Sequence, residues 1–142
     1  MPKQILKAYK VRLYPTIDQQ VFFAKSFGCV RFIWNKMLSD KIEHYKETKT
    51  TLTNYPAQHK KEFEWLQEVD SLALSKVERH LQKAYQSFFK NGTGFPKFKK
   101  KGQRDSYITN NQKGTVAITN NTVKLPKIGH ISAKFPNKIN GL

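Results

Sequence analysis

Apolar and polar residues alternate at the start of the chain. Between residues 5 and 14 apolar side chains occupy one side of the alternation, and the other side carries Lys10, Arg12 and Tyr14. A period of two is typical of a β-strand with one buried face. Pro15 ends this strand, and Thr16 with Gln19 three positions later makes a capping box, which predicts that a helix begins here.

A helical period of three to four replaces the alternation over residues 16–90. The first helix is expected to stop at Gly28, where a second follows after a short turn. Pro56 suits the first turn of a third helix, and Asp70 caps a fourth, which ends at Gly92. The apolar seam of the fourth helix is the clearest in the chain and consists of Leu74, Val77, Leu81, Ala84 and Phe88. The pattern predicts four short helices that form a small bundle.

Strand and turn signals return beyond Gly92. Residues 115–126 have the pattern of a hairpin with an Asn-Asn turn, and residues 130–135 alternate again with Ile131 on the apolar side. We therefore expect an α+β fold in which a helical bundle is inserted after the first strand of a β-structure. The β-structure comprises residues 1–15 and 91–142, and the inserted helical bundle comprises residues 16–90.

The distribution of charge gives the two ends of the chain a shared property, because both are strongly basic. The 142 residues include 26 Lys or Arg against 10 Asp or Glu, a net charge of +16. Residues 1–16 hold four basic residues and no acid, residues 90–142 hold eleven and one acid, and residues 17–89 hold eleven and nine. Such an asymmetry indicates a polyanionic partner, for which nucleic acid is the default. If the two ends meet in the β-structure, they form one basic surface.

Composition excludes several other classes of protein. Cys29 is the single cysteine, which rules out an internal disulfide and fits a cytoplasmic protein, and no apolar run suggests a signal peptide or membrane span. The histidines are scattered without a cysteine pair, so we expect no metal site. The basic half of the chain offers only Asp105, whereas metal-dependent phosphodiester cleavage needs converging carboxylates. We expect no cofactor, no catalytic residue and no membrane partner.

The densest chemical signal is a basic and aromatic run over residues 94–107. Its cations can neutralise phosphates, and exposed rings can stack on unpaired bases for roughly 1–3 kcal/mol each. For Phe95 and Phe98 a place in the core is an equally good interpretation. The expected nucleic-acid contacts of this run are Lys97, Lys99, Lys100, Lys101, Arg104 and Tyr107. The outward residues of the first strand, Lys10, Arg12 and Tyr14, have a similar claim.

Five blocks of the chain resemble the amino-terminal part of the TnpB family. They are "KAYKVRLYPT" (7–16), "FGCVRFIWNKML" (27–38), "WLQEVDSLAL" with "LQKAYQSFF" (65–89), "GFPKFKKKG" (94–102) and "VKLPKIGHI" (123–131). The blocks follow the family's order over nearly the whole chain. TnpB proteins are RNA-guided DNA endonucleases encoded by IS200/IS605-type insertion sequences.

This resemblance implies a more specific architecture. In the family an antiparallel β-barrel, the wedge domain, is interrupted after its first strand by a helical recognition domain. It thus implies a partial, wedge-like barrel from residues 1–15 and 91–142, and a four-helix recognition domain from residues 16–90. The barrel's last strands and the RuvC-like nuclease domain would lie beyond Leu142, so we expect binding without catalysis.

The resemblance also implies partners and contact positions. The partners are a guide (omega-type) RNA and double-stranded DNA, with a transposase or a nuclease-bearing chain in trans as a further candidate. Positions that align with the family's readers of the target-adjacent motif are Asn54, Ser71, Leu72, Ser75, Gln112 and Lys113. For Ser71, capping of the fourth helix is an equally good interpretation.

Other functions fit part of the sequence. A general basic RNA-binding protein of the ribosomal type suits the small size and the pI of about 10.0. A DNA-binding regulator derived from TnpB, or a subunit whose active domain is supplied in trans, would use the same basic surface. A helix-turn-helix repressor would need a turn at Gly28, and the aromatic Phe32 and Trp34 favour packing instead.

Overall fold

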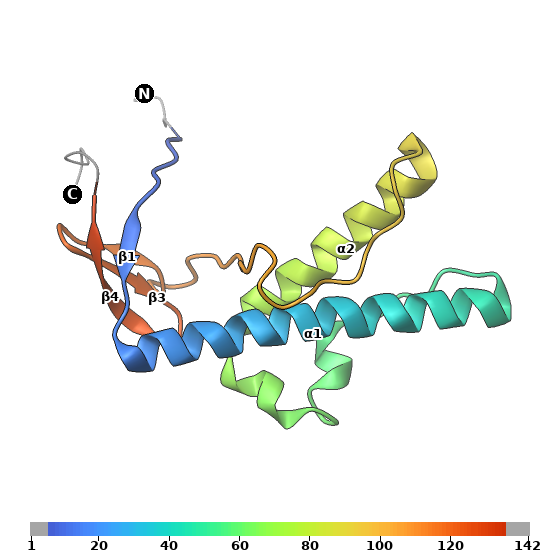
Figure 1. The fold of residues 1–142 in the computed structure, drawn as a ribbon, viewed down its shortest axis with the longest axis horizontal. Coiled ribbons are helices and arrows are strands. Elements are labelled where there is room, and N and C mark those ends of the chain that lie inside the picture. The colour runs from blue at the N-terminus through green and yellow to red at the C-terminus, as the bar shows by residue number, and fades with distance from the viewer. Residues whose placement is uncertain (1–5, 136–142) are drawn as a thin grey trace. The chain divides into compact units, whose positions relative to one another are not determined.

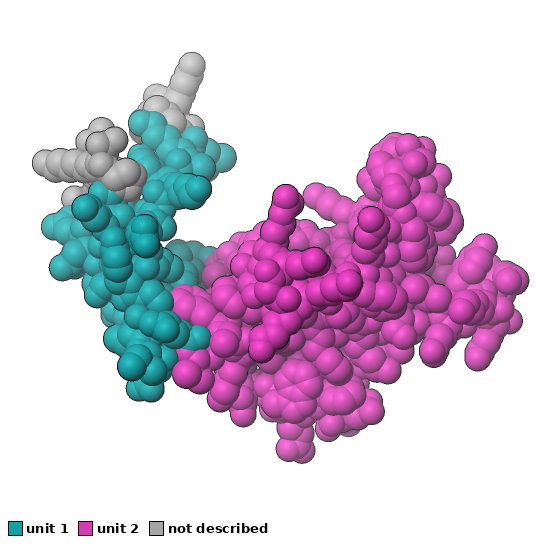
Figure 2. Space-filling model, in the orientation of Figure 1, with its two compact units in different colours: residues 1–20, 111–142 teal, residues 21–110 magenta. Residues whose placement is uncertain are grey.

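The computed structural model describes residues 6–135, which form an open antiparallel sheet and two long helices (Figure 1). The elements in chain order are β1 (Arg12–Tyr14), α1 (Ile17–Thr48), the 3-10 helices η1 (Pro56–His59) and η2 (Glu64–Glu68), α2 (Ser71–Asn91), β2 (Ala117–Ile118), β3 (Thr122–Leu125) and β4 (Gly129–Lys134). Contacts divide the chain into two compact units, residues 1–20 with 111–142 and residues 21–110 (Figure 2). None of the described helices is long and apolar enough to cross a membrane.

The sheet has the strand order β1-β4-β3-β2, so segments from both ends of the chain pair with each other. Leu13 lies opposite Ala133, and Val123 lies opposite Ile131, which is fully buried. The α+β class, the hairpin and the pairing of the two ends are confirmed. In the described part of the chain the sheet is open rather than closed into a barrel, because β1 has three residues and β2 has two.

The prediction of a helix end at Gly28 is wrong, because Gly28 lies inside α1, which is 32 residues long. A glycine inside a helix costs about 1 kcal/mol relative to alanine. Ser26 and Cys29 beside it are buried, as are Ile33 and Met37 further along, and burying an apolar side chain yields more than that cost. The helix start is as predicted, since Gln19 N–H donates to Thr16 Oγ1 (3.2 Å) and Thr16 N–H donates to Gln19 Oε1 (2.9 Å).

The expected third helix is also wrong, so residues 16–90 hold two long helices instead of four. Pro56 begins η1, which has four residues, and η2 follows it as a second single turn. Neither segment reaches the length at which a helix is stable on its own, and each is held by buried residues such as Leu66.

Both ends of α2 follow the predicted signals. The Asp70 carboxylate accepts a hydrogen bond from Leu72 N–H at 3.1 Å, and Gly92 adopts a left-handed conformation with φ of 66°. The predicted seam is buried at Leu74, Val77 and Leu81. It packs with α1 and η2 into one core, whose buried members are Cys29, Val30, Ile33, Trp34, Met37, Leu38, Leu66, Val69, Ala73, Leu74, Val77 and Leu81.

Candidate nucleic-acid interface

The segment that follows α2, residues 92–110, runs back along α2 and crosses α1 without regular secondary structure (Figure 1). Two side chains of α1 fix its backbone. Trp34 Nε1 donates to the carbonyl oxygen of Lys97 at 2.7 Å. Asn35 Nδ2 donates to the carbonyl oxygen of Lys99 at 3.0 Å, and Lys99 N–H donates to Asn35 Oδ1 at 2.8 Å. These three bonds give an irregular basic segment a defined path.

The basic side chains of this segment fall into two groups. Lys97, Lys100, Lys101 and Arg104 are exposed. Lys99 is exposed as well, but its ammonium lies 4.3 Å from the centroid of the Trp34 ring, and partial burial lowers the pKa of Lys99. The predicted phosphate contacts are thus grouped on one segment, but Lys99 also packs on the core.

The single acid of residues 90–142 is neutralised within the same region. Asp105 Oδ1 lies 2.5 Å from Arg31 Nη1 of α1, and both side chains are partly buried, at 30% and 18% exposure. An ion pair of this kind removes the one negative charge that would repel a phosphate. The exposed charge of the segment is therefore entirely positive.

Tyr107 anchors the end of the segment. Its ring centroid lies 6.2 Å from that of Phe23 and 5.9 Å from that of Phe27, so the ring is largely covered. Burial and the nearby charge of Asp70 raise the pKa of Tyr107 to about 12. The hydroxyl of Thr109 donates to the same Asp70 carboxylate. This placement gives Tyr107 a structural contact, whereas Phe98 remains 53% exposed.

A basic face on α2 was not predicted from the sequence. Between residues 79 and 104 there are eight Lys or Arg and no acid. A polar hollow of about 390 Å³ on α2 is lined by Lys76, Arg79, His80, Gln82, Lys83 and Gln86. Lys76 and His80 also line a second hollow together with Lys99, so the helix face and the segment 92–110 form one basic surface. The sequence signal was the spacing of its basic residues, which recur every three to four positions. A count of charges over residues 17–89 hides this spacing, because the acids of that stretch nearly balance the basic residues.

The positions inferred from the resemblance are spread over three places. Ser71 and Ser75 are exposed on the first turns of α2, where Ser75 Oγ donates to the Ser71 carbonyl at 3.2 Å. Asn54 is only 5% exposed, and its Nδ2 donates to the carbonyl oxygen of Met37 at 3.2 Å. Asn54 therefore holds the segment after α1 in place, and we leave it out of the proposed surface.

Gln112 and Lys113 belong to the other compact unit and lie in an exposed turn before β2. The N–H of Gln112 donates to Thr115 Oγ1 at 2.9 Å, and Lys113 has a left-handed conformation with φ of 53°. The side chains of both residues are exposed.

The sheet of that unit carries a second basic surface. Lys10, Arg12 and Tyr14 line an open hollow of about 680 Å³ together with Lys134 and Phe135. Arg12 lies directly opposite Lys134 in the strand register, and its guanidinium is 5.8 Å from the centre of the Tyr14 ring. Like charges opposite each other destabilise a strand pair unless an anion compensates them. This geometry is suited to a phosphate.

The described residues offer no group of three or more His, Cys, Asp or Glu side chains that could hold a metal ion. The chemistry of both surfaces is that of cations, amides and aromatic rings. Such groups bind phosphates and bases without a cofactor.

Comparisons with known proteins agree with the resemblance seen in the sequence. Residues 1–50 match a family model of the IS605 OrfB type, described as a helix-turn-helix domain. A Streptomyces pristinaespiralis protein named as an RNA-guided DNA endonuclease is 32% identical over 108 residues, which cover 70% of this chain. The RNA-guided DNA endonuclease InsQ of Escherichia coli (strain K12) is 26% identical over 144 residues, 96% of this chain. The chain belongs to the TnpB family.

This TnpB-family chain spans 26% and 36% of the lengths of those two relatives. It also resembles the virulence protein VsdF of Salmonella dublin, with 34% identity over 113 residues that cover 68% of this chain and 95% of VsdF. Most of the segment matched as a helix-turn-helix domain lies in α1, which has no turn between Ile17 and Thr48.

Proposed function

We propose that this chain is the nucleic-acid-binding module of a transposon-encoded TnpB-type protein. In this proposal it holds a guide RNA and target-adjacent duplex DNA and contributes binding rather than cleavage. The helical unit, with the segment 92–110 that is tied to α1, serves as the recognition part, and the sheet unit serves as the wedge-like part. Two relatives are named as RNA-guided DNA endonucleases, which supports the choice of partners.

The observation that carries the proposal is the fixed basic segment of residues 92–110. Trp34 and Asn35 define its backbone, Arg31 neutralises its single acid, and its five cations remain exposed. A surface of fixed, uncompensated cations binds phosphates and releases their counterions. The basic face of α2 extends this surface with a further set of cations and amides.

The test is a salt titration of binding to an RNA hairpin and to a short DNA duplex. The triple variant Lys97→Gln, Lys100→Gln, Lys101→Gln should weaken binding and lower the slope of log K against log salt by about 2 to 3, since each phosphate contact contributes about 0.7–0.9. The matched control is Lys25→Gln, Lys60→Gln, Lys61→Gln, which changes the net charge equally on another part of the chain. The control should stay within about twofold of the parent.

Equal losses in the two triple variants would mean that net charge alone attracts the nucleic acid, and the assignment of the segment would be wrong. Binding that does not change with salt would contradict the proposal as a whole.

A further inference from the structure

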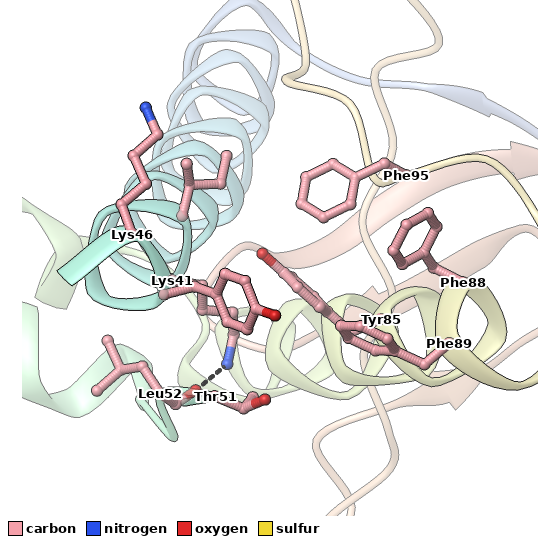
Figure 3. Close-up of a pocket in the computed structure, with 10 residues that line it drawn as sticks. Lys41, Lys46, Thr51, Leu52, Tyr85, Phe88, Phe89 and Phe95 are labelled. Carbon is pink, nitrogen blue, oxygen red and sulfur yellow. Dashed lines mark hydrogen bonds between the residues drawn. The ribbon is translucent and has the colours of Figure 1, made fainter. Parts of the chain in front are cut away.

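A cavity of about 320 Å³ lies between the last turns of α1, the residues that follow it, and the last turns of α2 (Figure 3). Its walls are mostly aromatic and apolar, and include Tyr45, Leu52, Tyr85, Phe88, Phe89 and Phe95. The volume falls at the lower end of the range of small-ligand sites, about 300–1,000 Å³. The cavity can therefore hold one small ring system.

The aromatic rings are preassembled but incompletely covered. The Tyr85 ring stacks on Phe89 with centroids 6.3 Å apart, and Phe95 meets Phe88 edge to face at 5.2 Å. Phe89 nevertheless remains 60% exposed, and Tyr45 remains 47% exposed. Rings held in place by their neighbours and open to solvent are a ready stacking surface, because little conformational entropy is lost when a flat ligand binds.

Lys41 adds a polar group to this cavity. Its ammonium donates to the carbonyl oxygen of Leu52 at 2.6 Å and lies 5.6 Å from the centre of the Tyr85 ring (Figure 3). Burial lowers the pKa of Lys41. An ammonium has three donors, so a ligand with an acceptor edge can take a hydrogen bond from it. None of the described residues that line the cavity is Asp or Glu, although Glu78 lines an adjoining hollow and its charge partly offsets the effect of burial on the pKa of Lys41. Lys46 stands at the rim with its ammonium turned away from the rings.

We propose that this cavity binds one unpaired base of an RNA whose backbone lies on the basic surface described above. An unpaired nucleotide has a base with the π-face that the rings accept and an acceptor edge that suits Lys41, and its phosphate suits the cations of the basic surface. The acid-free stretch from residue 79 to residue 104 includes Tyr85, Phe88, Phe89 and Phe95, so it supplies both rings and charge. This inference rests on the proposed function, and it names where such an RNA would be read.

The test compares an RNA hairpin that carries one bulged purine with the same hairpin fully paired. Replacing the purine with 2-aminopurine gives a fluorescence signal that is quenched when the base stacks. The bulged hairpin should bind about tenfold more tightly, as expected for one stacked base, and its fluorescence should fall on binding. Phe89→Ser should remove most of this preference, while the matched control Phe98→Ser, which changes an equally exposed ring outside the cavity, should keep it.

A second variant leaves the walls intact. Thr51→Trp places an indole into the cavity from an exposed lining residue, so it should exclude the base and lower the preference for the bulge without removing any ring. If the bulged and paired hairpins bind equally, or if Thr51→Trp and Phe89→Ser both keep the preference, the base site is wrong although the salt-dependent binding stands. Capture of an apolar peptide in place of the base would overturn the inference in the same way. Loss of all salt-dependent binding would instead contradict the proposed function.

Discussion

Neighbouring lysines in one basic run have different roles in this protein. Lys97, Lys99, Lys100 and Lys101 are all exposed, but the Lys99 ammonium also packs over the ring of Trp34, whose Nε1 holds the backbone of Lys97. The four residues have the same side chain and are nearly consecutive, so the sequence alone could not separate them. The distinction depends on where α1 places Trp34, which is a property of tertiary packing.

Tyr107 gives a testable consequence of burial at the level of one residue. Its pKa is raised to about 12, against about 10 for an exposed tyrosine in the unfolded chain. The neutral phenol is therefore favoured in the folded protein, and its contribution to stability is complete below pH 10 and is lost as the pH rises toward 12. Because the ring is partly exposed, we expect the loss to be on the order of 1 kcal/mol over this range.

Denaturant unfolding at pH 9, 10, 11 and 12 checks this prediction. The quantity to compare is the free energy of unfolding of the parent minus that of Tyr107→Phe, which cancels the titration of lysines. That difference should decline between pH 10 and pH 12. A difference that is constant over this range would show that the phenol of Tyr107 ionises as an exposed group does.

At the scale of elements, local signals predicted ends well and lengths poorly. The caps at Thr16, Asp70 and Gly92 were all found, because each cap is a bond between residues close in the sequence. The predicted break at Gly28 is absent from the structure, because buried contacts on both sides of the glycine stabilise the helix. Residues 56–68 form two short 3-10 helices instead of one α-helix, because their backbone conformation depends on the buried side chains that pack on the core. The basic face of α2 follows the predicted helical period, but it was missed by counting charge in blocks.

Two glycines offer a direct test of the continuous α1. Gly28 lies inside the helix, and a Cβ added there would meet only Arg31 Nη2 at 3.8 Å, an ordinary contact. Gly28→Ala should therefore raise the free energy of unfolding by about 0.5–1 kcal/mol. Gly92→Ala should lower it by about 1 kcal/mol, because Gly92 ends α2 with a positive φ. If Gly28 instead ended a helix before a turn, both variants would be destabilised in urea unfolding.

The sheet should show opposite effects on stability and on binding. Lys134 lies opposite Arg12 on the same face, so Lys134→Glu replaces a repulsion with an attraction and should stabilise the protein by about 0.2–1 kcal/mol. The same change should weaken binding to the DNA duplex, because it removes a cation from the hollow beside Tyr14. Thermal unfolding and a binding titration measure the two effects. The control Lys7→Glu lies outside the strands and changes the net charge by the same amount, so it should not stabilise the protein. If it stabilises the protein as much as Lys134→Glu does, the cross-strand pair is not the cause.

On the scale of the whole molecule, the charge of the chain is divided between two compact units. One unit carries the sheet surface of Arg12 and Lys134, and the other carries the segment 92–110 with the face of α2. The sequence predicted the charged ends and their pairing in one sheet. It did not predict that much of the second basic region belongs to the helical unit, since residues 92–110 are tied to α1 by Trp34 and Asn35.

This division gives a test of whether one nucleic acid occupies both units. If it does, the double variant Arg12→Gln, Lys134→Gln and the triple variant Lys97→Gln, Lys100→Gln, Lys101→Gln should each lower the salt slope, by about 2 and about 2 to 3. Their combination should then lower it by the sum, because the salt slope counts all the phosphates of that nucleic acid that the protein contacts. If only the helical unit binds, the double variant will leave the slope unchanged, and the combined variant will equal the triple. Salt titrations of all four proteins with one DNA duplex and one RNA hairpin distinguish these outcomes. Additivity on one nucleic acid but not on the other would identify which of the two partners spans both units.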